Sequence, residues 1–311
     1  MGRYRFAVWT PSYNRATYLP RAYESLIAQT YKEFEWIIID DGSTDNTQDV
    51  VESFISEGLL PSIKYIKKRN GGKHTAWQTL MDVVKSDYII TLDSDDTLTP
   101  DALSIFDKYW SQLEKSNEYA SFWEVKARVQ DQFGKMVGTQ LPRKIFDSTT
   151  GELIFKHKIK AEMQACRRTE VLQNEAKVPN YFMFKENCSN FPEGIRWLRA
   201  GKIYKSRYVD EIVRTYYSDA PDQLVKSNRN NRSIKRTYNH LIGAKYMIEE
   251  NRQIMLQWDK RAYIFSITTL LYTSFSLSKN PFSILVNSSN LDKVMMLLFY
   301  TPIFLLYKIR K

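Results

Sequence analysis

Cysteine is scarce in this chain, which has two among its 311 residues, Cys166 and Cys188. Their spacing matches no metal-binding motif, so the sequence excludes a disulfide-stapled scaffold and fits a reducing compartment. Histidine is nearly as rare, and the three that occur (His74, His157 and His240) lie far apart along the chain. A zinc site or a Ser-His-Asp hydrolase therefore finds no support.

Long apolar runs are missing as well. The longest, Val294 to Tyr307, has 14 residues and contains Thr301-Pro302, whereas a membrane-spanning helix needs about 20. The start of the chain has no apolar signal-peptide region, and Phe6 stands where a myristoylation signal requires Ser or Thr. We therefore expect a cytoplasmic protein that does not cross the bilayer.

What the sequence does contain is typical of a folded protein, with 43% apolar and 26% charged residues. The length allows one large domain or two modest ones. The net charge of +10 is uneven, because residues 1–142 carry −4 and residues 143–311 carry +14. The second half therefore favours an anionic partner, such as nucleic acid, anionic lipid or a phosphorylated substrate.

The first hundred residues alternate strand-like and helix-like segments. Apolar runs predict four strands, at residues 6–9, 34–39, 63–66 and 88–92. Helical spacing of apolar residues predicts helices between them, at residues 18–30, 47–56 and 74–84. This rhythm predicts an α/β fold with a mostly parallel sheet covered on both faces. In such sheets, ligands bind at the carboxyl ends of the strands.

The rest of the chain changes character twice. From about residue 118 the pattern is mixed, with strand-like pieces at 122–129, 202–208 and 213–217. From about residue 230 it becomes helical, and we expect a helical C-terminal region.

An acidic tetrapeptide, Asp93-Ser94-Asp95-Asp96, follows the strand predicted at 88–92. Three carboxylates at the end of a strand repel one another unless a cation lies between them. Mg²⁺ or Mn²⁺ is the natural partner, with substrate phosphates completing its oxygen shell. The alternative is an acidic turn that caps the next helix, because residues 97–101 also resemble a helix start.

Polar loops follow all four predicted strands, at residues 10–15, 40–43, 70–73 and 93–96. A bound nucleotide accounts for them together. Asp40 or Asp41 can accept the imide N–H of a pyrimidine base or hold ribose hydroxyls. Gly71-Gly72 lets the backbone approach a ligand closely, and Lys73 can meet a phosphate. The acidic tetrapeptide can hold ribose and a metal that bridges a diphosphate.

Residues 6–106 resemble the nucleotide-sugar-binding half of a family 2 glycosyltransferase with the GT-A fold. The resemblance lies in four stretches, Thr10-Pro11-Ser12-Tyr13-Asn14-Arg15, Ile37 to Asp45, Asn70-Gly71-Gly72-Lys73 and Leu92 to Asp96. It implies a nucleoside-diphosphate-sugar donor, a UDP-sugar in our interpretation, and inversion at the anomeric carbon. It also implies Mn²⁺ or Mg²⁺ as cofactor.

The resemblance further implies roles for single residues. Asp95 would be the main metal ligand, with Asp96 as a second one, and Asp93 would lie near the ribose. The nucleotide site would comprise Pro11, Tyr13, Asn14, Arg15, Asp40, Asp41, Gly72, Lys73, Asp93 and Ser94.

In this family the catalytic base comes from the second half of the fold. The best local match is the stretch 190–197, which makes Glu193 the first candidate. The chain departs from the family pattern here, since it has Pro-Glu-Gly where many members have an adjacent Glu-Asp pair, so Glu186 stays an alternative. Glu193 could also do no more than stabilise a helix N-terminus.

The predicted domains are a GT-A glycosyltransferase domain over residues 1–217 and a helical region over residues 218–311. The first comprises a nucleotide-binding half (1–106) and an acceptor half (107–217). In the second, basic residues flank the apolar segment at 293–311. This pattern suits a segment lying on an anionic membrane surface. Core packing or a homo-oligomer contact are the alternatives.

We therefore predict a metal-dependent inverting glycosyltransferase, peripheral on the inner face of the cell membrane. Its acceptor would be a glycan or a lipid-linked saccharide in surface polysaccharide synthesis. The alternative is a catalytically weak, nucleotide-sugar-binding scaffold in a polysaccharide assembly complex. A nucleic-acid partner is not expected, because the basic residues form no recognisable binding module.

Overall fold

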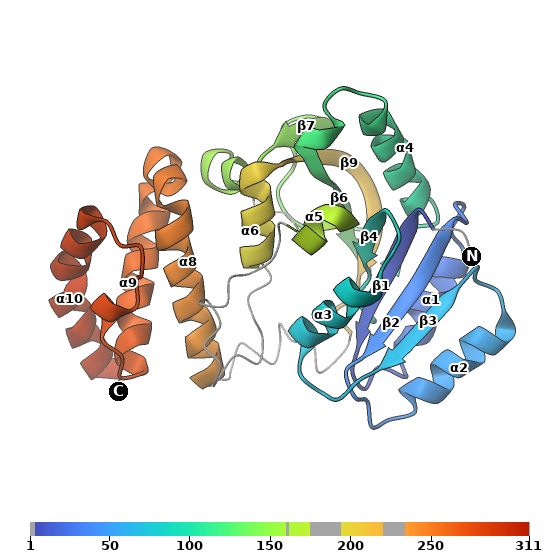
Figure 1. Cartoon of the computed structure of the whole chain (residues 1–311), viewed down its shortest axis with the longest axis horizontal. Helices are drawn as coiled ribbons and strands as arrows, with labels where there is room; N and C mark the ends of the chain where they lie inside the picture. The colour runs from blue at the N-terminus through green and yellow to red at the C-terminus, as the bar shows by residue number, and fades with distance from the viewer. Residues whose placement is uncertain (1–3, 160–161, 175–193, 220–233, 311) are drawn as a thin grey trace. The chain divides into compact units, whose positions relative to one another are not determined.

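The computed structural model describes residues 4–159, 162–174, 194–219 and 234–310 (Figure 1). The chain divides into two compact units. The first, which we call the sheet unit, comprises residues 1–150, 159–177 and 199–226. The second, the helical unit, comprises residues 151–158, 178–198 and 227–311.

The sheet unit is built on a nine-stranded sheet in the order β3-β2-β1-β4-β8-β6-β9-β5, with β7 paired to β9. Four parallel strands come first along the chain: β1 (Phe6–Ser12), β2 (Phe34–Asp40), β3 (Ile63–Lys67) and β4 (Tyr88–Thr91). The later strands are β5 (Thr97–Leu98), β6 (Phe122–Asp131), β7 (Ile145–Ser148), β8 (Met163–Arg168) and β9 (Lys205–Tyr216). β8 pairs antiparallel with both β4 and β6, so the sheet is mixed and the predicted α/β class is confirmed.

β1 is longer than the strand expected at residues 6–9, and it includes Pro11 in the middle of the sheet. Proline lacks the N–H that a central strand needs for pairing. The Trp9 carbonyl accepts a hydrogen bond from the Leu92 amide, and Pro11, two residues on, faces the same side. β4 ends at Thr91, which pairs with Trp9. No residue of β4 is therefore paired with Pro11, and the N–H that proline lacks is not needed there.

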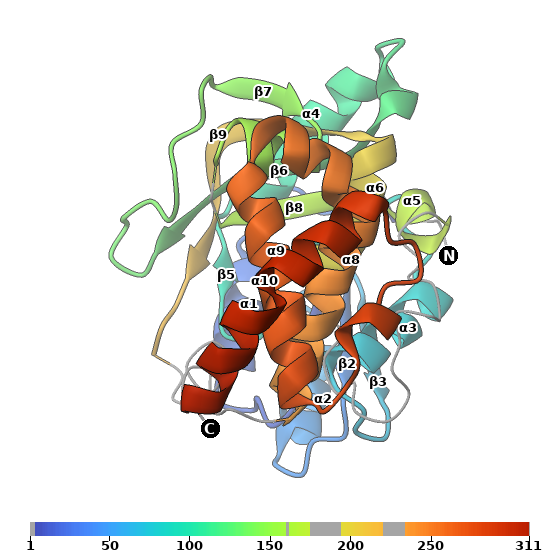
Figure 2. The ribbon, with the colours of Figure 1, turned by 90° about the vertical axis from the view of Figure 1, so that its left-hand side faces the viewer.

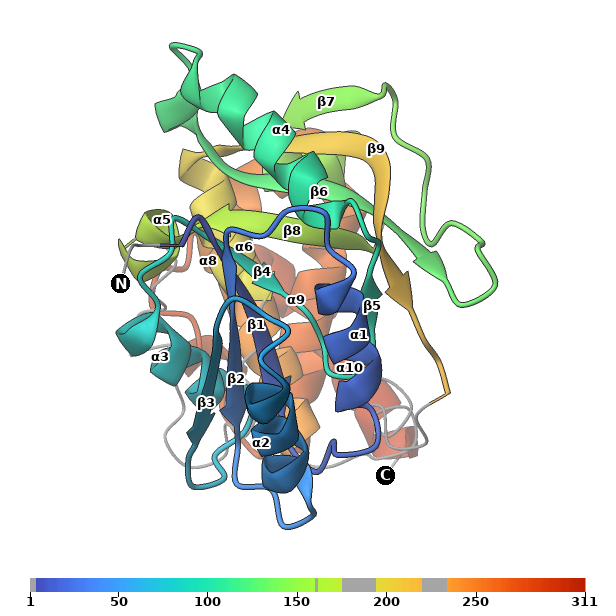
Figure 3. The same cartoon turned by 90° about the vertical axis from the view of Figure 1, so that its right-hand side faces the viewer.

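Helices cover both faces of the parallel strands. One face packs against α1 (Leu19–Ile27), α2 (Thr47–Glu57) and α4 (Ala102–Glu114), as Figure 3 shows. Every second residue of β1 and β2, namely Phe6, Val8, Phe34, Trp36 and Ile38, belongs to the hydrophobic core on this face, as the pleat of a strand requires. On the other face lies α3 (Lys73–Val83), where Trp77 meets Trp9 edge to face with ring centroids 5.2 Å apart.

β9 is a single strand, although the sequence predicted two separate pieces. Residues 209–212, which include the polar pair Asp210-Glu211, lie between the two predicted pieces. The structure accommodates these polar residues where the register between β6 and β9 shifts, around Arg128. The first two residues of the piece expected at 202–208 belong instead to α6 (Gly194–Ile203).

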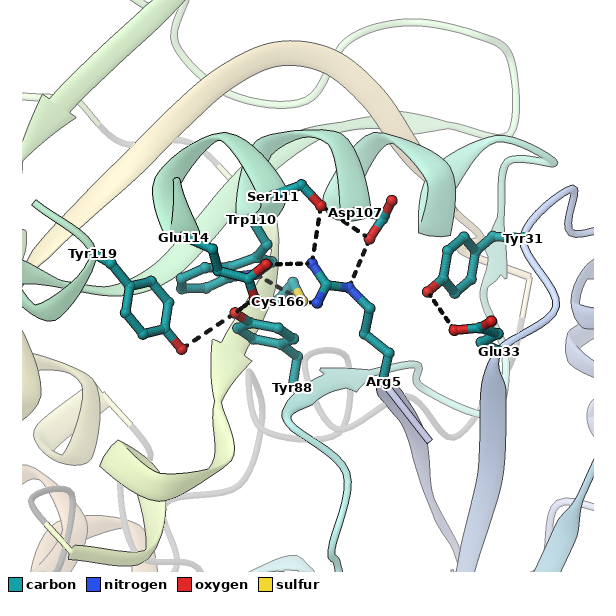
Figure 4. A network of polar contacts seen from close by, with 10 residues as sticks. All are labelled: Arg5, Tyr31, Glu33, Tyr88, Asp107, Trp110, Ser111, Glu114, Tyr119 and Cys166. Carbon is teal, nitrogen blue, oxygen red and sulfur yellow. Dashed lines mark hydrogen bonds and ion pairs between the residues drawn. The ribbon is translucent and has the colours of Figure 1, made fainter. Parts of the chain in front are cut away.

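A polar network fastens the amino end of β1 to α4 (Figure 4). The Arg5 guanidinium lies 2.6 Å from Asp107 and 3.1 Å from Glu114, and the Tyr88 hydroxyl donates to Glu114 at 2.5 Å. Cys166 lies beside this network and is fully buried, and its burial raises the pKa of the thiol. The network therefore stabilises the edge of the sheet opposite the strand carboxyl ends.

The helical unit contains the short π-helix at Glu152–Lys156, the 3₁₀ turn at Pro281–Ser283 and three long helices, α8 (Ile234–Trp258), α9 (Lys260–Ser276) and α10 (Asn290–Arg310). Figure 2 shows the three long helices packed on one another. Their buried residues, including Leu241, Ile248, Leu270 and Met296, form a second hydrophobic core. α10 continues through Pro302, which lies inside the helix.

Asp292 joins the three long helices. It is fully buried near the start of α10, accepts a hydrogen bond from Tyr263 of α9 at 2.8 Å and lies 2.5 Å from Arg252 of α8. A buried carboxylate needs such partners to offset the loss of hydration. Of the helices in the described ranges, none combines the length and apolar composition that a membrane span needs.

Candidate active site

Four loops lie at the carboxyl ends of β1, β2, β3 and β4. Parallel strands place these ends at one edge of the sheet, so residues far apart in sequence meet there. The contacts described below join the loop after β1 to that after β2, the loop after β2 to that after β3, and α3 to the loop after β4.

Asp40, the last residue of β2, is fully buried and already engaged on both oxygens. Oδ1 accepts hydrogen bonds from the Ser43 amide at 2.8 Å and the Ser43 hydroxyl at 2.6 Å. Oδ2 accepts from the Tyr65 hydroxyl at 2.5 Å. Asp40 therefore fixes the turn after β2 and ties it to β3.

Asp41 joins the loop after β2 to the loop after β3. Oδ1 accepts from Lys68 Nζ at 2.6 Å and from the Gly71 amide at 3.0 Å, and Oδ2 accepts from the Gly72 amide at 2.6 Å. Gly72 has φ +89°, a conformation that L side chains rarely adopt. The sequence singled out the glycines but not Lys68, whose ammonium partly neutralises the Asp41 carboxylate.

Gly42 shows how closely the two loops approach. Its φ is +83°, and a Cβ placed there would lie 2.9 Å from the backbone nitrogen of Asn70. Backbone cannot yield as a flexible side chain can, so only glycine fits at this position.

Asn14 joins the loop after β1 to the same turn. Its backbone is left-handed at φ +53°, a conformation that asparagine tolerates better than most residues. The Asn14 amide donates to the Ser43 hydroxyl at 2.8 Å, and its side-chain oxygen accepts from the Thr44 amide at 2.8 Å. The neighbouring Tyr13 is 48% exposed, and the Arg15 amide donates to the Thr47 hydroxyl at 3.1 Å.

Lys73 starts α3 and reaches the acidic loop, which we define as residues 93–96. Lys73 Nζ lies 3.1 Å from Asp93 Oδ1. This ammonium, with Arg214 and Arg15 farther off, holds the pKa of Asp93 below its usual range despite partial burial. Asp93 is therefore a carboxylate at neutral pH, paired with a cation that could turn to a phosphate.

Asp96 lies inside the sheet unit and is 1% exposed. One oxygen accepts from the Tyr217 amide at 3.1 Å and the other lies 3.5 Å from Arg214 Nε. Burial raises the pKa of Asp96 to about 7, although the nearby Arg214 guanidinium opposes the shift. Ser94 is also buried.

Asp95 is half-buried, and its carbonyl oxygen accepts a hydrogen bond from Arg21 of α1. Neither Arg21 nor Arg214 is among the predicted site residues. No local signal marks them, because one lies within an amphipathic helix and the other within a strand.

The metal that the family resemblance implies can be tested against these residues. Within the described ranges, no three His, Cys, Asp or Glu side chains gather closely enough to hold a metal ion by themselves. Asp93 already faces Lys73, and Asp96 faces Arg214. This arrangement fits Mn²⁺ or Mg²⁺ that takes one or two carboxylates from the protein and its remaining oxygens from water and a diphosphate.

Both candidates for the catalytic base, Glu193 and Glu186, lie outside the described residues. The described chain resumes at Gly194 with α6.

A cleft of about 700 Å³ opens elsewhere on the sheet unit. Its lining includes Tyr4, Glu35, Lys85 and Ser86, which lie at or just before the amino ends of β1, β2 and β4. It is therefore at the opposite edge of the sheet from the four loops, and none of the predicted site residues line it.

Comparisons with known proteins agree with this geometry. The family model described as Glycosyl transferase family 2 matches residues 7–166. Chondroitin synthase from Pasteurella multocida (strain Pm70) is 38% identical over 99 residues, which are 32% of this chain and 10% of that protein. This chain therefore spans about a tenth of that relative's length.

Solved structures show the same fold at low sequence identity. S. aureus TarS 1–349 in complex with UDP-GlcNAc has a TM-score of 0.58 and 17% identity, over 94% of this chain and 78% of that chain. Mannosyltransferase PcManGT from Pyrobaculum calidifontis, in complex with GDP-Man and Mn²⁺, has a TM-score of 0.51 and 14% identity, over 99% of this chain and 84% of that chain. The likeness confirms the predicted fold class.

Proposed function

Because the chain belongs to glycosyl transferase family 2, we propose that it transfers a sugar from a nucleoside-diphosphate-sugar to a hydroxyl group of a saccharide acceptor, with inversion at the anomeric carbon. One observation carries the proposal: four loops lie together at a single edge of the sheet. Asp41 accepts hydrogen bonds from the Gly71 and Gly72 amides, and Lys73 pairs with Asp93. Closely approaching backbone, a lysine and carboxylates together suit a nucleotide diphosphate.

A UDP-sugar is the donor that we propose, and the TarS complex with UDP-GlcNAc supports this choice. The named relative is a chondroitin synthase, which supports a glycan or lipid-linked saccharide acceptor in surface polysaccharide synthesis. Asp95 would hold Mn²⁺ or Mg²⁺, and the PcManGT complex with Mn²⁺ supports a divalent cation.

In the proposed reaction, a carboxylate takes the proton from the acceptor hydroxyl. At the same time the oxygen of that hydroxyl bonds to the anomeric carbon. The bond from that carbon to the diphosphate oxygen breaks in the same displacement, and UDP leaves. When bound, the divalent cation would neutralise the charge that develops on the leaving diphosphate. Glu193 is the first choice for the proton acceptor and Glu186 the alternative. Lys73 adds a further positive charge beside Asp93.

A donor screen tests the proposal. The protein is incubated with a panel of UDP-sugars, Mn²⁺ and candidate saccharide acceptors, and release of UDP is measured. We expect turnover with at least one donor and its loss in Asp95→Ala. The control is Asp82→Ala, an exposed carboxylate on α3, which should behave as the wild type. No turnover with any donor, or full activity of Asp95→Ala, would contradict the assignment.

The scaffold alternative gives a different result in the same preparation. UDP would bind in calorimetry without turnover, and Glu193→Gln and Glu186→Gln would change nothing. If only one of these two variants loses turnover while it keeps UDP affinity, that residue is the base.

We also propose that the protein attaches to the inner face of the cell membrane through the outer face of α10. On this face Leu298 is 65% and Ile309 85% exposed, whereas Met296 on the opposite face is 1% exposed. Residues 293–311 contain no Asp or Glu and four basic residues, Lys293, Lys308, Arg310 and Lys311. Exposed apolar side chains flanked by cations are typical of helices that lie on anionic lipid.

The charges also argue against pairing of α10 with a second copy. In a parallel pair the basic C-terminal ends would face each other, and in an antiparallel pair Lys293 would face Lys308. Like charges so placed are unfavourable.

Vesicles that contain phosphatidylglycerol test the attachment. We expect Leu298→Gln/Leu305→Gln to reduce co-sedimentation several-fold, since each exposed leucine lost removes apolar area that would be buried in lipid. Leu59→Gln, an equally exposed leucine of the sheet unit, is the matched control and should bind as the wild type. Unchanged binding by the α10 variant would overturn the proposal.

A further inference from the structure

We propose that Arg21 and Arg214 are positioning residues that hold the acidic loop, residues 93–96, in place for the metal and the donor diphosphate. On this assignment Asp96 anchors the loop and is not a metal ligand. The inference rests on the proposed function, because it takes Asp95 as the residue that holds the cation.

The first anchor is the Asp96 carboxylate. It is buried, accepts from the Tyr217 amide at 3.1 Å and lies 3.5 Å from the Arg214 guanidinium. Tyr217 follows β9 directly, and Arg214 lies within it. Both partners therefore join the loop after β4 to the end of a strand more than a hundred residues later in the chain.

Arg214 is itself held in a defined position. Its Nη1 donates to Gln164 at 3.1 Å and its Nη2 to Glu162 at 2.8 Å. A guanidinium has a rigid planar fork of donors, so these two contacts fix the direction in which Nε points. Gln164 also donates to the Thr91 carbonyl at 2.7 Å, at the last residue of β4. The anchor therefore reaches the acidic loop from both of its sides.

The second anchor is the Asp95 carbonyl, which accepts from Arg21 of α1. The same guanidinium lies 2.8 Å from Asp219 and stacks on the Tyr217 ring at 3.7 Å from its centroid. The contact uses the main chain of Asp95, so it orients this residue without consuming its carboxylate.

The two anchors act on consecutive residues and converge on the same short segment, residues 217–219. A ligand held on a loop binds a metal well only if the loop is already in the productive geometry. Partners that orient a ligand from behind typically contribute about 10–100-fold in metal affinity. The structure thus assigns to α1 and β9 the task of orienting the metal-binding loop.

Two measurements on the 311-residue chain test the inference. Hydrogen–deuterium exchange reports on residues 93–98 and 216–219 without any ligand. Calorimetry with UDP, with and without Mn²⁺, gives the affinity for the metal–nucleotide pair. The variants are Arg21→Gln, Arg214→Gln, Asp96→Asn and the double variant Asp96→Asn/Arg214→Gln.

We expect each single variant to speed exchange in both segments and to weaken Mn²⁺-dependent UDP binding by about tenfold. Asp96→Asn and Arg214→Gln should not be additive, because each removes the same contact. The matched control is Arg5→Gln, whose guanidinium pairs with Asp107 and Glu114 at the opposite end of β1 (Figure 4). It should lower the melting temperature and leave UDP affinity unchanged.

Unchanged exchange in the variants would overturn the inference, because the anchors would then not hold the loop. Faster exchange with unchanged affinity would also overturn it, since the contacts would then be structural only. Additive effects of Asp96→Asn and Arg214→Gln would exclude Asp96 as the partner of Arg214. Failure of the wild type to bind UDP would instead refute the proposed function, and the exchange measurement would still decide whether the two segments are joined.

Discussion

At the scale of single residues, aspartates at the same end of the sheet serve different purposes. Asp40 and Asp41 use both of their oxygens to hold turns and amides. Asp93 faces a lysine, and Asp96 is buried against Arg214. The surroundings, not the residue type, therefore decide which carboxylate can meet a cation.

Replacing Asp41 tests the joint between two of the loops. Asp41→Asn keeps the size of the side chain but removes the charge that meets Lys68 and replaces one acceptor oxygen by an NH₂ group facing an amide. Hydrogen bonds to charged groups contribute about 1.5–3 kcal/mol, so we expect UDP affinity to fall by at least about tenfold. Isothermal calorimetry with UDP measures it.

Asp45→Asn is a suitable comparison for Asp41→Asn. The Asp45 carboxylate lies in the same loop after β2 but accepts hydrogen bonds from Thr47 and Ala16. The substitution should affect the stability of the turn and leave UDP binding nearly unchanged. Equal loss of UDP affinity in both variants would show that the effect comes from general distortion of the loop.

Glu124 gives a prediction of pH dependence. It is fully buried in β6, and although burial alone would raise its pKa, Lys126 at 2.9 Å and Arg167 at 3.0 Å hold that pKa below its usual range. Because the folded-state pKa is the lower one, the ionised group stabilises the fold above the ordinary glutamate value of about 4.3. This contribution is lost as the pH falls through the folded-state pKa.

We therefore expect Glu124→Gln to lower the free energy of unfolding by about 3 kcal/mol at pH 7, because two cations lose their buried partner. The difference from the wild type should shrink below about pH 4. Urea denaturation at several pH values measures it. A difference that stays constant down to pH 3 would show that the loss comes from packing and not from charge.

Local sequence indicates what chemistry a residue can do better than it indicates which residues it contacts. The residues after each predicted strand pointed to a nucleotide site because their types and order are informative on their own. Arg21, Lys68 and Arg214 could not be found in this way. Their roles depend on which strands are neighbours in the sheet. β9 lies beside β5 and β6, from which it is separated by many residues along the chain.

At the scale of elements, β1, β2 and β4 follow from their continuous apolar runs, since both faces of these strands are buried, and the helices follow from their helical apolar spacing. Errors arose where pairing overrides local preference. β1 continues through Pro11 because its neighbour has already ended, and β9 continues through Asp210-Glu211 because a shift in register accommodates them. Neither reason is visible in a short window of sequence.

The start of α10 depends on one buried carboxylate, which gives a prediction for the helical unit. Asp292→Asn removes the negative charge that faces Arg252 and weakens the contacts with Tyr263 and Ser289. We expect a loss of about 3 kcal/mol, the usual effect of breaking a buried ion pair. Hydrogen–deuterium exchange should become faster in α9 and α10.

Asp49→Asn provides the comparison for Asp292→Asn. Asp49 also lies in the first turn of a helix, α2, but is exposed, so its replacement should change stability by less than about 1 kcal/mol. If the two variants lost equal stability, the loss in Asp292→Asn would come from the interaction with the helix dipole and not from the buried contacts of Asp292.

At the scale of the whole molecule, the positive charge and the predicted nucleotide site lie in different parts of the sequence. The predicted nucleotide and metal residues are in the first hundred residues, whereas the positive charge is in the second half, at +14 for residues 143–311. A nucleotide site does not need this excess. An anionic surface that holds the acceptor would account for it, and electrostatic attraction of this kind acts over about a Debye length.

Salt dependence therefore separates the two contributions to membrane attachment. Between 50 and 300 mM NaCl the Debye length falls from about 14 to about 6 Å, so we expect co-sedimentation with phosphatidylglycerol vesicles to fall several-fold. Lys293→Gln/Lys308→Gln should weaken binding at low salt and flatten the salt dependence, because each lysine near the surface contributes about 1 kcal/mol. Lys64→Gln/Lys85→Gln, exposed lysines of the sheet unit, should change neither. Binding that resists salt but disappears in Leu298→Gln/Leu305→Gln would mean that apolar insertion alone attaches the helix.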